Sequence, residues 1–187
     1  ALFFDISRLK EQQAQLERMA HFDALTGLPN RLLLADRLKQ AMRQATRRGQ
    51  HVAVVYLDLD GFKAVNDTHG HELGDRLLIA LARRINEALR EGDTLARIGG
   101  DEFVAVLMDL PDIDSSTPIL HRLLEAAAQP VKLGNFDLQV SASIGVSVYP
   151  QEDEIDADQL TRQADQAMYK AKQCGKNRDQ LFDAEPV

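Results

Sequence analysis

Two short acidic segments hold the residue types best suited to chemistry. One is Gly99-Gly100-Asp101-Glu102, flanked by apolar, strand-like residues at 94–96 and 103–107. Two strands joined by a tight Gly-Gly turn form a β-hairpin, and this hairpin would carry two adjacent carboxylates at its tip. Glycines there permit positive φ and let a large ligand approach the backbone. Taken alone, an ordinary acidic turn is the simpler explanation of this motif.

The second acidic segment, Asp58-Leu59-Asp60, ends an apolar run over residues 52–57 that predicts a strand buried on both faces. If this strand end lies beside the hairpin, Asp58, Asp101 and Glu102 converge on one point. Their repulsion would raise each other's pKa, and a divalent cation would relieve it. Mg²⁺ prefers carboxylate and phosphate oxygens. The two segments together predict a Mg²⁺ site where a hydroxyl is activated against a phosphoryl group, with Lys63 neutralising the phosphate charge.

Composition restricts the class of protein. The 187 residues can bury one substantial core, and 27% charged with 44% hydrophobic residues is usual for a globular domain. No apolar run is long enough for a membrane span, no secretory signal opens the chain, and the single Cys174 fits a reducing compartment. A net charge of −7 argues against sequence-independent nucleic-acid binding. We interpret Arg43, Arg47 and Arg48 as a solvated helix face, and the chain as a cytosolic-type domain.

Predicted strands and helices alternate along the chain, which indicates an α/β or α+β fold around one sheet. Besides the 52–57 strand and the hairpin, strict alternation predicts a half-buried strand over residues 136–148, and residues 180–182 are a candidate edge strand. The polar stretch 61–75 receives no predicted element and is interpreted as functional. Apolar stripes at helical spacing predict helices over residues 31–48, 73–90, 117–128 and 158–172.

The N-terminal segment predicts a helix over residues 7–21 with sparse apolar positions at seven-residue spacing. Such a helix pairs with a copy of itself or serves as an unpaired linker, and two heptads do not separate these alternatives. Because the chain opens with apolar side chains and no initiator Met, we expect a fragment of a longer protein. The expected division is residues 1–22 as the end of an upstream sensor with a signalling helix, and 23–187 as the catalytic domain.

Six sequence blocks, in a fixed order between residues 23 and 177, resemble the GGDEF diguanylate cyclase family. This resemblance implies condensation of two GTP into cyclic di-GMP and two pyrophosphates. It also implies a five-stranded mixed sheet surrounded by helices, similar to nucleotidyl cyclases and polymerase palm domains. Residues 3–7 resemble the end of a PAS-type sensor, which leaves open a membrane-anchored parent protein. The blocks are residues 23–31, 58–67, 70–75, 97–103, 143–145 and 164–172.

The resemblance also implies roles for individual residues. Mg²⁺, with Mn²⁺ as an alternative, would be held by Asp58, Asp101, Glu102 and the Leu59 carbonyl. Asp101 would be the general base for the 3′-hydroxyl, and Lys63 would stabilise the transition state. The family more often has Arg at position 176, so the phosphate contact there is expected to be a point charge. The GTP phosphates would contact Gly99, Gly100, Lys172 and Lys176, with Phe62 also at the substrate.

Asn66 and Asp75 match the family's guanine-reading pair, with His71 nearby. The chemistry agrees, because guanine offers two donors that a carboxylate accepts, whereas adenine presents an acceptor at N1. This favours GTP over ATP. A structural interpretation remains open beside it: Asn66 caps a turn, and Asp75 favours the start of the following helix through its dipole.

Arg90 and Asp93 match the family's Arg-x-x-Asp product-inhibition motif, with Arg122 as a possible contributor from a second subunit. Because the product joins two nucleotides through two equivalent bonds, two copies must face each other about a two-fold axis, and a homodimer is expected. The partners expected are GTP, cyclic di-GMP and a second copy, with no nucleic acid and no membrane contact from this segment. The alternatives are a non-enzymatic cyclic di-GMP receptor and a GTP-binding regulatory domain.

Overall fold

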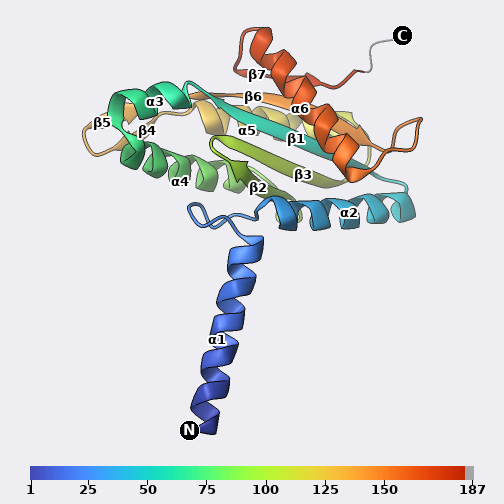
Figure 1. The fold of residues 1–187 in the computed structure, drawn as a ribbon. Helices are drawn as coiled ribbons and strands as arrows, with labels where there is room; N and C mark the ends of the chain where they lie inside the picture. Colours follow the sequence, from blue (N-terminus) through green and yellow to red (C-terminus); the bar gives the residue numbers. More distant parts are fainter. Residues whose placement is uncertain (184–187) are drawn as a thin grey trace.

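The computed structural model describes residues 1–183 and has a five-stranded mixed sheet at its centre (Figure 1). The strand order is β2-β3-β1-β6-β7, and only the β6–β7 pair is parallel. The predicted fold class is confirmed. The predicted edge strand near residue 180 corresponds to β7. The strands are β1 (His51–Asp60), β2 (Thr94–Gly99), β3 (Glu102–Leu110), β6 (Ser141–Tyr149) and β7 (Arg178–Leu181).

Helices cover both faces of the sheet. The side chains of β1 alternate between them: Val52, Val54 and Tyr56 pack in the cluster formed with α2 (Arg31–Arg48) and α6 (Ala157–Gln173). The intervening residues, among them Val55 and Leu57, pack in the cluster formed with α4 (His71–Glu87) and α5 (Thr117–Ala128). A short 3₁₀ turn, η1 (Asp114–Ser116), precedes α5. Burial on both faces explains why the 52–57 run is continuously apolar.

The polar stretch after β1 is helical, which the sequence analysis did not predict. It forms α3 (Phe62–His69) and the first turns of α4, with a break at Gly70. Helix α4 ends at Glu87, earlier than the predicted residue 90. Apolar periodicity does not reveal α3, because only Phe62 of its eight residues is buried and the helix has no apolar stripe.

The prediction of one half-buried strand over residues 136–148 is wrong. Its first part, β5 (Phe136–Leu138), pairs with β4 (Val131–Leu133) in a separate two-stranded sheet. Its second part, β6, is buried on both faces. The serines that suggested a solvent face are buried and bonded: Ser147 donates to the Leu160 carbonyl at 2.6 Å, and Ser143 donates to Asp60 at 2.7 Å.

Helix α1 (Leu2–His21) extends away from the body and buries none of its residues (Figure 1). It begins five residues earlier than predicted. Its exposed apolar side chains include Leu2, Phe3, Leu9 and Leu16. Within residues 1–183, no helix combines the length and the apolar composition that a bilayer span requires. The division at residue 22 into two functional units stays a prediction.

Candidate active site

The end of β1 lies directly beside the Gly-Gly turn. Asp58 pairs with Glu102 in the β1–β3 ladder, and the Leu59 amide donates to the Asp101 carbonyl at 3.2 Å. Gly100, at φ 51°, turns the chain between β2 and β3. The two acidic segments that the sequence singled out are therefore neighbours, as expected from an antiparallel pairing of their strands.

The expected convergence of three carboxylate side chains is not what the structure shows. Within residues 1–183, no three acidic, His or Cys side chains gather as ligands of one metal ion. Glu102 instead accepts a hydrogen bond from the Tyr56 hydroxyl at 2.9 Å, and Asp58 forms an ion pair with Lys172 at 3.3 Å. The reason is that Tyr56 and Asp58 share one face of β1, so Glu102 opposite Asp58 also lies within reach of Tyr56.

The charges at this strand end are incompletely balanced. Burial and repulsion from Asp101 raise the pKa of Asp58 to about 6, against the opposing attraction of Lys172. Burial would lower the pKa of Lys172, but Asp58 and Asp60 more than offset it, so that pKa is raised. Carboxylate oxygens that repel one another are donors that a hard divalent cation prefers. Asp58, Asp101 and Glu102 stay the predicted ligands, although their side chains do not form one ligand group within residues 1–183.

Asp60 is a functional candidate that the sequence analysis quoted but gave no role. Its side chain is 7% exposed and accepts four hydrogen bonds. Burial alone would raise the pKa of Asp60, but these donors lower it. Alternation along β1 is the signal that would have found it, because Asp58 and Asp60 must share one face. The donors are Ser141 Oγ (2.7 Å), Ser143 Oγ (2.7 Å), the Asn177 amide (3.1 Å) and Lys172 Nζ (3.2 Å).

Two of the four bonds of Asp60, those from Lys172 and Asn177, fix the C-terminal end of α6 at the acidic strand end. Lys176 and Asn177 have φ values of 60° and 47°, a left-handed pair that directs the Asn177 amide toward Asp60. Close packing places the helix itself, because a Cβ at Gly145 would clash with the α6 backbone at Ala164 and Met168. Lys172 therefore lies between Asp58 and Asp60, and Lys176 follows in the exposed turn.

The loop before α2 supports the hairpin from outside the sheet. Arg97 donates to both oxygens of Asp23, at 3.0 and 3.2 Å, and to the Gly100 carbonyl at 2.9 Å. Although burial opposes the effect, hydrogen bonds from Thr26 and the Arg97 charge lower the pKa of Asp23. The block at residues 23–31 thus positions the turn. From the sequence alone, residues 23–31 are only one of the family's blocks, and their structural role follows from the Arg97 contacts.

Helices α3 and α4 meet at Asn66 and Gly74. A Cβ at Gly74 would clash with Asn66 Oδ1, so only glycine lets the amide lie there. Asn66 Oδ1 is buried and accepts no hydrogen bond within residues 1–183, which suits an acceptor that a ligand would satisfy. Asp75 follows Gly74 and is exposed, as are His71 and Lys63.

Phe62 differs from the other predicted substrate residues. Its side chain is 6% exposed and belongs to the core cluster against α4. The substrate-binding role of Phe62 stays a prediction. Phe62 is the first residue of α3, and the backbone amides of a first helical turn have no intrahelical partner. A contact between Phe62 and a ligand would therefore run through its backbone amide.

The predicted inhibitory pair is a formed contact. Arg90 grips both oxygens of Asp93 at 3.0 Å and donates to the Met108 carbonyl at 2.7 Å. Asp93 is 1% exposed and Arg90 is 41% exposed. Among the described contacts, Nη1 keeps its donors free for a ligand. Arg122, on α5, is exposed and makes no contact with this pair within residues 1–183.

The comparison with protein families identifies the family of this chain. The profile of the family described as "Diguanylate cyclase, GGDEF domain" matches residues 20–178. The chain belongs to the GGDEF diguanylate cyclase family. The resemblance drawn from the six sequence blocks is confirmed, while the upstream PAS-type sensor stays a prediction.

Several relatives are similar over most of this chain. The bifunctional diguanylate cyclase/cyclic di-GMP phosphodiesterase MucR of Pseudomonas aeruginosa is 44% identical over 94% of the chain. The diguanylate cyclase TpbB of the same species is 37% identical over 95%, and the cyclic di-GMP phosphodiesterase NbdA is 38% identical over 95%. The chain spans only 25%, 41% and 22% of these proteins, respectively.

Solved structures are similar in fold as well. The GGDEF domain of TpbB superposes with a TM-score of 0.83 at 36% identity, covering 87% of this chain and 95% of that one. The coiled coil and GGDEF domain of DgcB from Caulobacter crescentus, in complex with c-di-GMP, gives 0.82 at 27% identity. That match covers 96% of this chain and 94% of the other.

Proposed function

We propose that this chain condenses two GTP into cyclic di-GMP and two pyrophosphates. The observation that carries the proposal is the junction of the β1 end and the β2–β3 turn, where Asp58 lies opposite Glu102 and beside Lys172. Carboxylates that hold a cation, next to lysines that hold phosphate, are the parts that phosphoryl transfer requires. The relatives named as diguanylate cyclases support this assignment.

In each of the two transfers, a 3′-hydroxyl oxygen bonds to the α-phosphorus and the bond from that phosphorus to the bridging oxygen of pyrophosphate breaks. Asp101 would accept the hydroxyl proton as general base. A divalent cation held by Asp58, Asp101, Glu102 and the Leu59 carbonyl would supply charge neutralisation at the phosphates. Lys63 at the start of α3 would meet the charge that develops there, and Gly99 and Gly100 would admit the phosphates to the turn.

Lys172 and Lys176 are assigned to the terminal phosphates. Lys172 is held between Asp58 and Asp60, so it is already oriented toward the acidic strand end. Lys176 is exposed in the turn that the Asn177–Asp60 bond fixes. A lysine donates as a point charge, which suits phosphate groups that change during the reaction.

Asn66 and Asp75 are assigned to guanine, with His71 at the rim. The buried Asn66 Oδ1 and the exposed Asp75 carboxylate are acceptors from adjacent helices, and guanine carries an N1–H and an amino group. Adenine would present an acceptor where guanine donates. The expected preference for GTP over ATP follows from that mismatch.

The reaction requires two copies related by a two-fold axis, because one site holds one GTP. Helix α1 is the candidate for pairing them: it buries no residue, and Leu2, Leu9 and Leu16 repeat at seven-residue spacing. The similarity to a structure described as a coiled coil with a GGDEF domain supports this role. The lone Cys174 fits the cytoplasm as the working compartment.

Product inhibition is assigned to Arg90 and Asp93, with Arg122 from a second copy. Asp93 holds the Arg90 guanidinium in place, and the free Nη1 donors would bind guanine acceptors of cyclic di-GMP. Replacing Arg90 with Ala is expected to relieve inhibition. Arg83→Ala is the matched control, since Arg83 is an exposed arginine of α4 whose only ion pair within residues 1–183 is with Glu87 at 3.2 Å.

The experiment is to incubate the chain with GTP and Mg²⁺ across a range of protein concentrations and to identify the nucleotides by mass. We expect cyclic di-GMP, produced with a steeper than linear dependence on protein concentration. ATP should yield no cyclic product, and Asp101→Ala should abolish synthesis.

The competing function is a receptor that binds cyclic di-GMP without turnover. NbdA, named as a phosphodiesterase, shows that a match to this family occurs in proteins not named as cyclases. Absence of product from GTP at high protein concentration, in both the native chain and Arg90→Ala, would sink the cyclase assignment. Retained binding of cyclic di-GMP that Arg90→Ala abolishes would then establish the receptor.

A further inference from the structure

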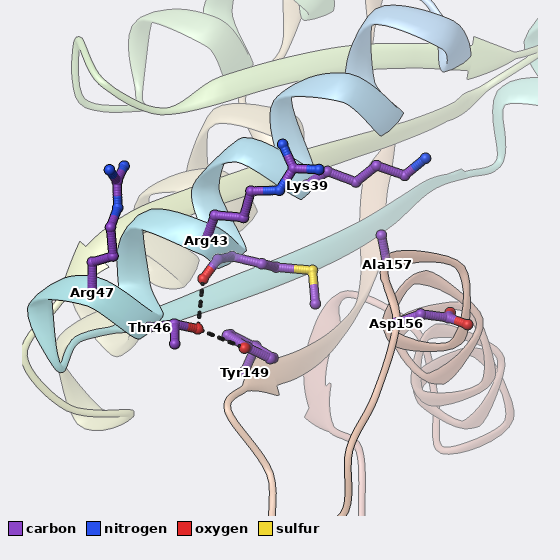
Figure 2. A pocket seen from close by; sticks show the side chains of 8 residues that line it. Lys39, Arg43, Thr46, Arg47, Tyr149, Asp156 and Ala157 are labelled. Carbon is purple, nitrogen blue, oxygen red and sulfur yellow. Dashed lines mark hydrogen bonds between the residues drawn. The ribbon is translucent and has the colours of Figure 1, made fainter.

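A groove of about 670 Å³ lies far from the candidate active site, between α2 and the junction of β6 with α6 (Figure 2). Tyr149, which lines it, pairs with Val52 at the start of β1, whereas Asp58 at the other end of β1 pairs with Ser143. Neither the predicted catalytic residues nor the Arg90–Asp93 pair line this groove. It is a separate surface that the proposed reaction does not use.

Three cations line the groove without partners. Lys39, Arg43 and Arg47 are exposed and project from successive turns of α2 (Figure 2). None of them forms an ion pair or a side-chain hydrogen bond within residues 1–183. Their neighbour Arg48, outside the groove, does pair with Asp109 at 3.5 Å. At four-residue spacing, each cation lies about 6 Å further along the helix.

The carboxylate that lines the opposite wall, Asp156, is already hydrogen-bonded within its own helix. Asp156 caps α6 because its carboxylate accepts a hydrogen bond from the Gln159 backbone amide at 2.8 Å. In return, the Gln159 side-chain oxygen accepts a hydrogen bond from the Asp156 backbone amide at 3.1 Å. A reciprocal cap fixes the carboxylate at the helix end. Asp156 forms no ion pair with the three α2 cations within residues 1–183.

The remaining lining is apolar and aromatic. Met42 and Ala157 are 8% and 6% exposed and form the floor. Thr46 Oγ1 lies 2.7 Å from Tyr149 Oη and 3.1 Å from the Met42 carbonyl, to which it donates, so the Tyr149 hydroxyl donates to Thr46 (Figure 2). This hydrogen bond fixes the orientation of the Tyr149 ring, which lines one side of the groove. An apolar floor with a few polar groups at the rim is typical of small-molecule sites of this size.

We propose that the groove between α2 and α6 binds an organic polyanion with an aromatic body, such as a nucleoside polyphosphate. The forked guanidinium groups of Arg43 and Arg47 suit phosphate oxygens, and the Met42–Tyr149 side suits a flat ring. The structure leaves Arg43, Arg47 and Arg48 exposed, as the sequence predicts, and the proposal adds a ligand for the first two. A ligand there contacts the first turn of α6, the helix whose last turn carries Lys172.

The test is calorimetric titration of the full chain with ATP in the absence of Mg²⁺, using adenosine and tripolyphosphate as the comparison probes. ATP is chosen because the proposed guanine site disfavours adenine. We expect ATP to bind more tightly than either probe, since only ATP carries both the ring and the charges. Equal binding of tripolyphosphate and ATP, or no binding of ATP, overturns the proposal.

Charge reversals locate the bound ATP. Arg43→Glu and Arg47→Glu should each weaken ATP binding about tenfold or more, because each removes a charge-assisted contact and adds a repulsion. Arg83→Glu makes the same change in net charge on exposed α4 and should leave binding unchanged. Loss of ATP binding in Lys176→Ala, with full binding in both groove variants, would place ATP at the active site and contradict the proposal. Thermal unfolding of every variant verifies folding.

Discussion

Asp58 and Asp60 are two residues apart on the same face of one strand, yet their surroundings differ in kind. Asp58 faces Asp101 and the Gly-Gly turn, and burial with that repulsion raises its pKa to about 6. Asp60 is surrounded by donors from β6 and from the end of α6, which lower its pKa. The first carboxylate carries negative charge that a ligand can satisfy, while the second is satisfied by the protein itself. One strand end thus provides a binding group and an anchor.

The largest expected difference between them is in turnover. Asp58→Asn should lower kcat by about 10³-fold, since it removes a charge from the reacting centre. Asp60→Asn should act mainly on the KM for GTP, by about 10- to 100-fold, because it weakens charge-assisted bonds that place Lys172 and the Asn177 turn. Steady-state kinetics with GTP at saturating Mg²⁺ measure both. Equal losses of kcat in the two variants would remove the distinction between binding group and anchor.

Stability should show the reverse order. Asp60→Ala leaves four donors without their acceptor and should lower the free energy of unfolding by about 2–4 kcal/mol. Asp58→Ala should leave the free energy of unfolding unchanged or raise it, because it removes a buried negative charge that Asp101 repels. Urea unfolding in the absence of metal measures these values. A destabilisation by Asp58→Ala as large as that by Asp60→Ala would contradict the assigned roles, and Asn at each position controls for the cavity that Ala creates.

The two carboxylates should also titrate with opposite effects on stability. The folded pKa of Asp58, about 6, exceeds its ordinary value of 3.8, so its contribution is fully present below about pH 4 and is lost as the pH rises through 6. The folded pKa of Asp60 is lowered, so its contribution is present above 3.8 and is lost as the pH falls through that lower value. In EDTA, the melting temperature of the native chain relative to Asp58→Asn should therefore fall between pH 4.5 and pH 7. If this difference in melting temperature does not change with pH, the pKa of Asp58 is not raised in the folded chain.

The smallest expected effect concerns Tyr56, which orients Glu102. Burial and the Glu102 bond raise the pKa of the Tyr56 hydroxyl, so it remains a donor. Tyr56→Phe should raise the Mg²⁺ concentration for half-maximal activity by about two- to tenfold, the value of one hydrogen bond. Tyr149→Phe is the control, because Tyr149 bonds to Thr46 at the opposite end of β1. If both variants respond alike, Tyr56 does not act through Glu102.

The sequence by itself determined the parts of this site that are local. An apolar run followed by Asp58, and a Gly-Gly turn between two strands, predict a strand end and a hairpin because their signals are contiguous. The six ordered blocks indicate the family for the same reason, since each block is a short contiguous motif. Periodicity failed where neighbours far along the chain decide: β6 looks half-exposed until α6 covers its serines.

Only the tertiary structure decided what surrounds those parts. The donors to Asp60 come from residues 81 to 117 positions later, and Arg97 meets Asp23 across 74 positions. Such partners leave no periodic signal, because each is a single polar residue in an element that folds for other reasons. The physical reason is packing: Gly145 lets α6 approach β6 closely enough for single polar atoms to meet. Residue types indicated the chemistry, and the packed sheet decided which carboxylate is free to perform it.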